Sequence, residues 1–251
     1  MDLQLAGKVG LVTGASQGIG RAIARGLATE GVQVAIVARR SDLLRQVATD
    51  IQRGGGAAPL VIEADLTRSE SPQRIATTAT QALGRIDILI NAAGGSRPIP
   101  IDASDETWQE GMTVNFVRLR ELSHAVIPGM RQNKFGRIIN ITGTSEPLGL
   151  NVAASAKAAV HAWAKGLSRE VAKQGITVNS LQPGRILSEQ IVRMHPTPED
   201  REKFAAQHIP MGRFGEPEEF ADVAVFLCSP RAGYVTGAVL PVDGGMSRFA
   251  F

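Results

Sequence analysis

The chain has 251 residues, 43% of them hydrophobic, and no linker-like or charge-rich stretch divides it, so we expect one domain over residues 1–251. Its 27 basic and 24 acidic residues leave a net charge of +3 without a basic cluster, which argues against a nucleic-acid partner. The single cysteine excludes an internal disulfide, and without a long apolar run or a signal-like start we expect a cytoplasmic protein with no membrane contact.

The first motif is a glycine-rich turn. An apolar run over residues 8–13 leads into Gly14-Ala15-Ser16-Gln17-Gly18-Ile19-Gly20, and a helical stripe of apolar residues follows. This order predicts a strand, a tight turn and a helix. Glycines let the backbone approach a pyrophosphate closely, and the helix N-terminus offers it free N–H groups. The segment is therefore typical of dinucleotide binding.

Two arginines follow the second predicted strand, residues 32–37. Arg39 and Arg40 stand where the adenosine ribose of a dinucleotide is expected, and Ala38 to Arg40 contain no carboxylate. An acidic side chain would accept from the 2′-hydroxyl of NAD, whereas arginine can pair with the 2′-phosphate of NADP. The pattern favours NADP as the cofactor, although NAD is possible. Alternatively, the two arginines are solvated at the surface and bind no cofactor.

Helices and strands continue to alternate to the end of the chain. This pattern predicts an α/β fold, a single-domain Rossmann-type doubly wound parallel sheet with helices on both faces. Polar residues follow three of the strands, at Asp65, Asn91 and 142–146, and together outline a cleft at the carboxyl ends of the strands. Beyond the first strand, helix and second strand, we expect helices at 41–53, 69–83, 113–132 and 217–227, and strands at 57–64, 86–91, 136–142, 176–181 and 238–242.

Several motifs in order carry a family resemblance over nearly the whole chain: Thr13 to Gly20, Asp65-Leu66, Asn91-Ala92-Ala93-Gly94, Asn115, Lys157, Pro183-Gly184, Val235-Thr236-Gly237 and Asp243-Gly244-Gly245. The chain resembles the short-chain dehydrogenase/reductase family, in particular its 3-oxoacyl-carrier-protein-reductase-like members. The resemblance implies a cofactor site that includes Gln17, although Gln17 replaces the basic residue of many NADP-using relatives. The other implied cofactor residues are Gly14, Ser16, Gly18, Ile19, Gly20, Arg39, Arg40, Asp65, Leu66, Asn91, Gly94, Lys157, Pro183, Gly184, Ile186 and Ser188.

The resemblance also implies a catalytic set, and here the sequence departs from it. The family uses a tyrosine four residues before the lysine, a serine after the fifth strand and an asparagine on the fourth helix. Lys157 and Asn115 match, but Ala153 stands at the tyrosine position and Gly143 at the serine position. Thr144 or Ser145 could replace the serine if the loop shifts. The loop is also about three residues shorter than usual. The coincidence of three departures favours natural divergence, and the alternative is an alanine introduced at position 153.

Other groups could then move the proton. Glu146 could act as acid or base if burial raised its pKa, although a solvated loop carboxylate is the alternative. Lys157 could act through a water in the space left at Ala153, or could only bind ribose. We interpret His161, one turn beyond Lys157, as a packing or interface residue. His195 and His208 belong to a segment at about 185–213 that resembles the family's substrate lid, and either could reach a substrate.

Three functional hypotheses remain open. The first is an NADP-preferring oxidoreductase acting on a small carbonyl or alcohol substrate, with Lys157, Asn115, Glu146 and Ser145 as candidate catalytic residues and no metal. The second is a cofactor-binding subunit or regulator without redox turnover, and the third a lyase or isomerase with Glu146 as base. The resemblance further implies a homodimer or homotetramer, to which the apolar tail with Phe249 and Phe251 could contribute; a fraying terminus is the alternative.

Overall fold

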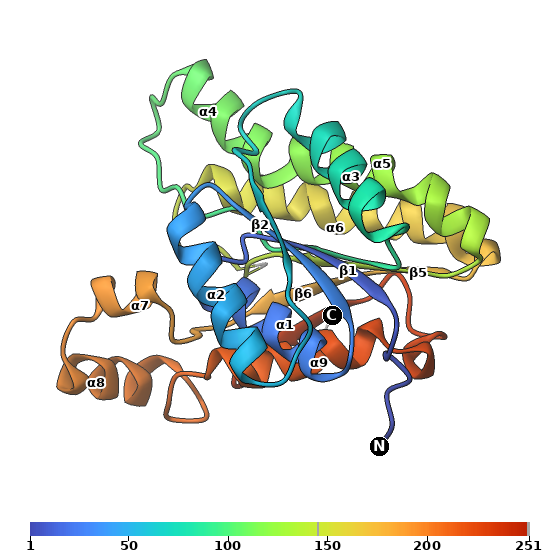
Figure 1. Cartoon of the computed structure of the whole chain (residues 1–251). Coiled ribbons are helices and arrows are strands. Elements are labelled where there is room, and N and C mark those ends of the chain that lie inside the picture. The colour runs from blue at the N-terminus through green and yellow to red at the C-terminus, as the bar shows by residue number, and fades with distance from the viewer. Residues whose placement is uncertain (145, 250–251) are drawn as a thin grey trace.

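One sheet of seven parallel strands runs through the molecule, in the order β3-β2-β1-β4-β5-β6-β7. The computed structural model describes residues 1–144 and 146–249 (Figure 1). The change of direction at β1 and β4 divides the strand order into two halves, as in a doubly wound fold. The strands are β1 Val9–Thr13, β2 Gln33–Ala38, β3 Leu60–Glu63, β4 Ile88–Asn91, β5 Gly136–Ile141, β6 Ile176–Pro183 and β7 Val239–Val242.

Helices cover both faces of the sheet, and the predicted α/β fold is confirmed. Helices α1, α2 and α9 lie on one face and α3, α5 and α6 on the other (Figure 1). The helices are α1 Gly18–Thr29, α2 Ser41–Arg53, α3 Ser71–Leu83, α4 Asp105–Met112, α5 Arg118–Asn133, α6 Val152–Val171, α7 Glu189–Met194, α8 Pro198–His208 and α9 Pro217–Cys228, with a π-helical turn at Thr113–Val117 and 3₁₀ turns at Ala172–Gln174 and Pro230–Ala232.

The strands are apolar on both sides because both sides are buried. In β1, Leu11 packs with the helices of one face and Val12 with those of the other. Phe220 of α9 and Leu27 of α1 are fully buried in the first layer, and Leu122 of α5 lies in the second. Burial of such side chains contributes about 1.5–3 kcal/mol each, so the two layers hold the helices against the sheet.

The helical region predicted at 113–132 is present as a π-helical turn followed by α5, but a further helix, not predicted, precedes it. Ser104 caps an earlier helix, α4, by accepting the N–H of Thr107, and a π-helical turn joins α4 to α5. The lid is also more ordered than its proline and charge content indicated, since it forms α7 and α8. Where the bounds of the other expected elements differ, they do so by one to three residues at an end.

A row of buried polar residues crosses the sheet near the carboxyl ends of four adjacent strands. Thr13, Asn91, Asn140 and Ser180 are successive register partners on β1, β4, β5 and β6. Asn91 donates from Nδ2 to Asn140 Oδ1 at 2.9 Å, which joins β4 to β5 through side chains. Beyond this polar row the strands end and the loops of the candidate site begin. Among the described residues, no helix is long and apolar enough to cross a membrane.

Candidate functional site

The glycine turn after β1 brings two loops into backbone contact. Gly14 has a φ of +66°, and a Cβ at this position would lie 2.8 Å from the carbonyl carbon of Ala92, in the loop after β4. Within the described residues, no side chain caps the first turn of α1, whose N-cap residue is Gln17. Its N–H groups are therefore available to a ligand, together with the positive end of the helix dipole, which suits a phosphate group.

Beside this turn, a cavity of about 330 Å³ lies between α1, α2 and α7. Arg40 donates a hydrogen bond from Nη2 to Gln17 Oε1 at its wall. Arginines outnumber carboxylates along this wall, so the cavity favours an anion. Its charged residues are Arg21, Arg40, Asp50, Glu189 and Arg193. Arg39 is not part of this lining; its charge acts on Asp65 instead.

Asp65 and Leu66 form a turn after β3. Asp65 Oδ1 accepts the N–H of Thr67 at 2.9 Å. This hydrogen bond, assisted by the charges of Arg39 and Arg68, holds the pKa of the Asp65 carboxyl below its ordinary value. Leu66 is partly buried against the core beneath α3 and α5. The pair therefore lies at the same edge of the sheet as the glycine turn, with a charged carboxylate at neutral pH.

The Asn91 side chain points into the protein. Its Nδ2 donates to Ser123 Oγ at 3.0 Å as well as to Asn140 Oδ1. The loop after β4 is held by Thr13 instead, whose Oγ1 accepts the N–H groups of Ala92 at 3.1 Å and Ala93 at 3.2 Å. Asn91 thus fixes the sheet below the site, and Thr13 fixes the backbone that lies over the glycine turn.

Lys157, Asn115 and Gly94 meet at the carboxyl ends of β4 and β5. Lys157 of α6 is 8% exposed, and its Nζ donates to the carbonyl oxygen of Ile141 at 2.6 Å. A Cβ at Gly94 would lie 2.7 Å from Asn115 Oδ1 and 3.3 Å from Lys157 Nζ, so only a glycine leaves these side chains in place. Burial lowers the pKa of Lys157 from 10.5 to about 8, because the ammonium loses hydration.

Asn115 occupies the π-helical turn. Its Nδ2 donates to the carbonyl oxygen of Gly111 at 2.9 Å, and its Oδ1 accepts the N–H of Gly95 at 3.1 Å. Both ends of the amide are used, and the side chain is 3% exposed. The turn thereby locks the loop after β4 to α4, and it holds Asn115 against Lys157 in a fixed orientation.

The start of α6 and the loop before it hold the remaining catalytic candidates. Ala153 is 5% exposed and lies one turn before Lys157, with its N–H donated to Asn151 Oδ1 at 2.9 Å. Glu146 Oε1 accepts the N–H of Arg248 at 2.8 Å, so this carboxylate contacts the C-terminal segment. Thr144 is exposed, and its Oγ1 accepts the N–H of Glu146. Ser145 lies outside the described residues.

The segment after β6 borders the glycine turn from the other side. Pro183 ends β6, and the N–H of Gly184 donates to Val242 at 3.0 Å. Ile186 is 6% exposed. Ser188 caps α7 by accepting the N–H of Ile191, and its Cβ lies 3.4 Å from where a Cβ of Gly18 would stand. The predicted cofactor residues on β1, α1 and β6 therefore surround one edge of the sheet.

Known proteins share this arrangement. The model of the family described as enoyl-(acyl carrier protein) reductase matches residues 14–247. The 3-oxoacyl-(acyl-carrier-protein) reductase of Vibrio cholerae is 39% identical over 248 residues, which cover 97% of this chain and 99% of that protein. The 7α-hydroxysteroid dehydrogenase of Escherichia coli K12 is 36% identical over 247 residues, 97% and 96% of the two chains. The chain belongs to the short-chain dehydrogenase/reductase family.

Solved structures agree with this assignment. The L-sorbose reductase of Gluconobacter frateurii, solved in complex with NADPH and L-sorbose, has a TM-score of 0.94 and 33% sequence identity, covering 99% of this chain and 100% of that one. A 7α-hydroxysteroid dehydrogenase solved with NADH and 7-oxo glycochenodeoxycholic acid has a TM-score of 0.91 and 34% identity, covering 100% and 98%. The short-chain dehydrogenase/reductase fold thus extends over the whole described chain.

The lid of this short-chain dehydrogenase/reductase has a core of its own. Ile191, Ala205, Ile209 and Phe214 are buried together within it. His195 is half-buried there, with its ring 4.6 Å from that of Phe204 and its Nδ1 3.0 Å from Asp200 Oδ2. The ring of the exposed His208 also lies 4.6 Å from that of Phe204. Both histidines therefore contact the lid itself.

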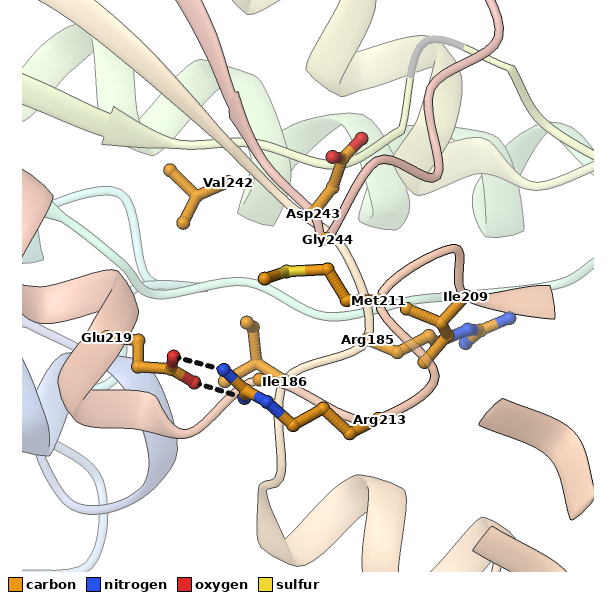
Figure 2. A pocket seen from close by; sticks show the side chains of 10 residues that line it. Arg185, Ile186, Ile209, Met211, Arg213, Glu219, Val242, Asp243 and Gly244 are labelled. Carbon is orange, nitrogen blue, oxygen red and sulfur yellow. Dashed lines mark hydrogen bonds and ion pairs between the residues drawn. The ribbon is translucent and has the colours of Figure 1, made fainter. Parts of the chain in front are cut away.

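A smaller cavity of about 90 Å³ lies at the base of the lid (Figure 2). Figure 2 shows Arg213 and Glu219 facing each other, with two hydrogen bonds of 2.7 Å between the guanidinium and the carboxylate. The Arg213 guanidinium lowers the pKa of Glu219 to about 2. This pair joins the end of the lid to the first turn of α9, and the sequence analysis did not identify it.

Two further contacts of the short-chain dehydrogenase/reductase site were missed from sequence. Asn151 donates from Nδ2 to Ser96 Oγ at 2.8 Å and accepts the N–H of Arg97, so it ties the loop after β4 to the start of α6. His161 Nε2 lies 2.9 Å from Thr142 Oγ1, beside the lysine. A capping asparagine before an alanine-rich helix was a usable signal for the first contact. Within residues 1–144 and 146–249, no cluster of His, Cys, Asp or Glu is suited to a metal ion.

Proposed function

We propose that this protein is an NADP(H)-preferring oxidoreductase that acts on a carbonyl or alcohol of a small molecule. The observation that carries the proposal is the buried ammonium of Lys157, held beside Asn115 and Gly94 at the carboxyl ends of β4 and β5. Relatives solved with NADPH and NADH support a nicotinamide cofactor for this edge of the sheet.

The residues present fit such a cofactor. The uncapped first turn of α1 and the close approach of Gly14 to Ala92 leave a backbone cradle suited to a pyrophosphate. When bound, the cofactor supplies or accepts a hydride. Asp65 and Leu66 would flank its adenine. The remaining residues that would hold it are Gly14, Ser16, Gln17, Gly18, Ile19, Gly20, Gly94, Lys157, Pro183, Gly184, Ile186 and Ser188. Asn91, predicted as a cofactor residue, would support the site only indirectly, because its amide is bonded to Ser123 and Asn140 inside the protein.

Arg40 supports NADP over NAD. It lines the cavity beside the glycine turn, and its link to Gln17 holds the guanidinium there, where it could pair with a 2′-phosphate. Gln17, which departs from the family's basic residue, would thus position a basic residue from α2. Arg39 contributes through its charge near Asp65.

Replacing Arg40 by alanine should weaken NADPH binding about tenfold or more and leave NADH binding nearly unchanged. The physical reason is loss of a charge-assisted hydrogen bond to phosphate, worth about 1.5–3 kcal/mol. Dissociation constants measured by cofactor fluorescence would check it. Arg45→Ala is the matched control, since Arg45 is exposed on α2, the helix that Arg40 caps, and is not part of the cavity lining. Equal losses for both cofactors would count against the phosphate role.

For proton transfer we infer a route through Lys157. Ala153 stands where the family's tyrosine is expected, and in this route a water would take the place of the missing phenol, one turn before the lysine. In the reductive direction, the Lys157 ammonium would pass a proton through this water to the substrate oxygen as the hydride reaches the carbonyl carbon. Because the pKa of Lys157 is about 8, the ammonium is present at neutral pH and is a stronger acid than an ordinary lysine.

The alternatives receive less support. Glu146 was the candidate base of a lyase or isomerase, but its carboxylate accepts from the backbone of Arg248 and Phe249. A cofactor-binding protein without turnover is favoured by the two departures from the family's catalytic set, Ala153 and Gly143, and by no contact in the structure. Cytoplasmic location, a single domain over residues 1–251 and assembly into a homodimer or homotetramer remain predictions.

A carbonyl panel tests the proposal. NADPH oxidation should be detected with at least one of a 3-oxoacyl thioester, a keto-steroid and a ketose, the substrate types that the names of the relatives indicate. The rate of reduction should fall as pH rises through about 8, because Lys157 loses the proton it donates. Tight NADPH binding without turnover on the whole panel would instead support the non-redox protein. Product formation with an unreactive nicotinamide analogue would indicate a lyase or isomerase.

A further inference from the structure

Two side chains of α6 hold consecutive residues at the end of β5. Lys157 Nζ donates to the carbonyl oxygen of Ile141 at 2.6 Å, and His161 Nε2 lies 2.9 Å from Thr142 Oγ1. Residues 157 and 161 are four apart and therefore lie on the same face of the helix. The imidazole thus stands next to the lysine and is anchored to the same strand end.

The contacts of Thr142 favour one tautomer of the ring. Thr142 Oγ1 lies 3.1 Å from the carbonyl oxygen of Leu181, to which it can donate its hydrogen. We infer that the hydroxyl oxygen then accepts from His161, in the tautomer whose Nε2 carries the ring proton. Nδ1 keeps a lone pair, and within the described residues it has no hydrogen-bond partner. The geometry therefore defines a neutral, oriented imidazole whose free nitrogen can take up a proton.

The surroundings of His161 disfavour a second charge. Burial lowers the pKa of His161, and the Lys157 ammonium lowers it further. The packed elements offer no compensating carboxylate among the described residues: β6 and the π-helical turn carry no titratable side chain, and Glu110 of α4 is paired with Arg97 at 2.7 Å. The other charged groups have partners as well: Lys165, one turn further along α6, donates to the carbonyl oxygen of Gly237, Glu146 accepts from Arg248, and Asp243 accepts from Ser247.

We propose that His161 is a positioning residue for Lys157. The neutral imidazole of His161 confines the lysine ammonium between Ile141 and the cleft, and protonation of the imidazole displaces the ammonium. The inference rests on the proposed function, in which Lys157 donates the proton. A protonated His161 would still donate to Thr142 and would stay in place, because the ring is held. The flexible lysine stem would move instead, since the like charges repel at short range in a poorly solvated site. The rate of carbonyl reduction should then fall at acid pH as His161 gains a proton; we call this fall the acid limit. It is separate from the fall at alkaline pH, where Lys157 loses its proton.

The pH profile of His161→Gln tests this role. Glutamine keeps an N–H donor for Thr142 but cannot gain a charge. In the native protein, kcat/KM should fall on the acid side of pH 6.5, since the pKa of His161 lies below that value, whereas the variant should keep its pH 7 value within a factor of two over the same range. His208→Gln, a change of an exposed lid histidine, should retain the native acid limit. An unchanged acid limit in His161→Gln would overturn the proposal.

Thr142→Val tests the anchoring separately. Valine preserves the shape of threonine but removes the acceptor for His161. Loss of one hydrogen bond should lower kcat roughly fivefold with little change in KM for NADPH, since only the orientation of the proton-donating pair is affected. An unchanged kcat with an altered KM for NADPH would contradict the positioning role.

An NMR titration separates this proposal from the proposed function, because it needs no turnover. The ¹⁵N shifts should identify His161 as the Nε2–H tautomer in the native protein. In Lys157→Met, removal of the neighbouring charge should raise the pKa of His161 toward its ordinary value of 6.5. If the pKa does not move, the proposal is wrong even if the enzyme is active. If the pKa of His161 rises in Lys157→Met but no carbonyl is reduced by the native protein, the coupling of His161 to Lys157 is confirmed and the proposed oxidoreductase function is wrong.

Discussion

Lys157→Met should lower kcat/KM for carbonyl reduction by about 10²–10⁴-fold, the usual contribution of a positioned general acid. Methionine fills a similar volume but carries no proton to donate and no charge to hold the cofactor ribose. Initial rates at saturating NADPH would isolate the chemical step from any weakening of cofactor binding. Lys165→Met is the matched control, because Lys165 lies on the same helix with its Nζ on the carbonyl oxygen of Gly237, away from the cleft.

The same variant should not be less stable at pH 7. The pKa of Lys157 is about 8 in the folded protein and 10.5 as an ordinary lysine, so unfolding takes up a proton between these values. Burial of the ammonium therefore opposes folding fully below pH 8, and this penalty decreases as pH rises from 8 to 10.5. Thermal unfolding of Lys157→Met at pH 7 should show an equal or higher Tm. Full activity in this folded variant would exclude Lys157 as the proton donor.

Ala153→Tyr should raise kcat by roughly tenfold or more if a water now occupies the space one turn before Lys157. A phenol there would donate its proton directly, and the adjacent ammonium would lower its pKa. Rates with the best carbonyl of the panel would be compared with those of Ala158→Tyr, which adds the same ring at an exposed position of α6.

Two results with Ala153→Tyr would change the interpretation of the site. Activity in the variant, with none in the native protein, would mean that the native chain binds the cofactor without turning over. A folded but inactive variant, compared with an active native protein, would mean that the space above Ala153 belongs to the substrate. Circular dichroism and NADPH binding would establish that the variant is folded in either case.

The sequence predicted the sheet, and the physical reason is the regular alternation of strands and helices. Parallel strands separated by helices must end at one edge, so residues that follow different strands converge there. This pattern predicted the convergence of the glycine turn, Asp65 and Asn91, whereas the pairing of Lys157 with Asn115 was expected only from the family resemblance. The strands themselves are buried on both sides and read as continuous apolar runs.

What the sequence could not supply is the direction in which each side chain points. Asn91 follows β4 as predicted, yet its amide faces Asn140 inside the protein. Glu146 lies on the predicted loop but accepts from the C-terminal backbone, which is about a hundred residues away in the chain. The π-helical turn that orients Asn115 depends on how α4 and α5 pack on α6, and residue periodicity does not encode it.

The polar row across the sheet separates two kinds of position in this chain. Amino-terminal to Thr13, Asn91, Asn140 and Ser180, side chains are buried among apolar neighbours, and a change there would be felt as lost stability. On the carboxyl-terminal side lie the loops that we propose as the ligand site. Because the backbone ladder continues to the polar row below them, these loops can change in length or sequence without exposing the core. The proton donor of such a protein could thus be replaced during evolution while the sheet and its two helical layers stay unchanged.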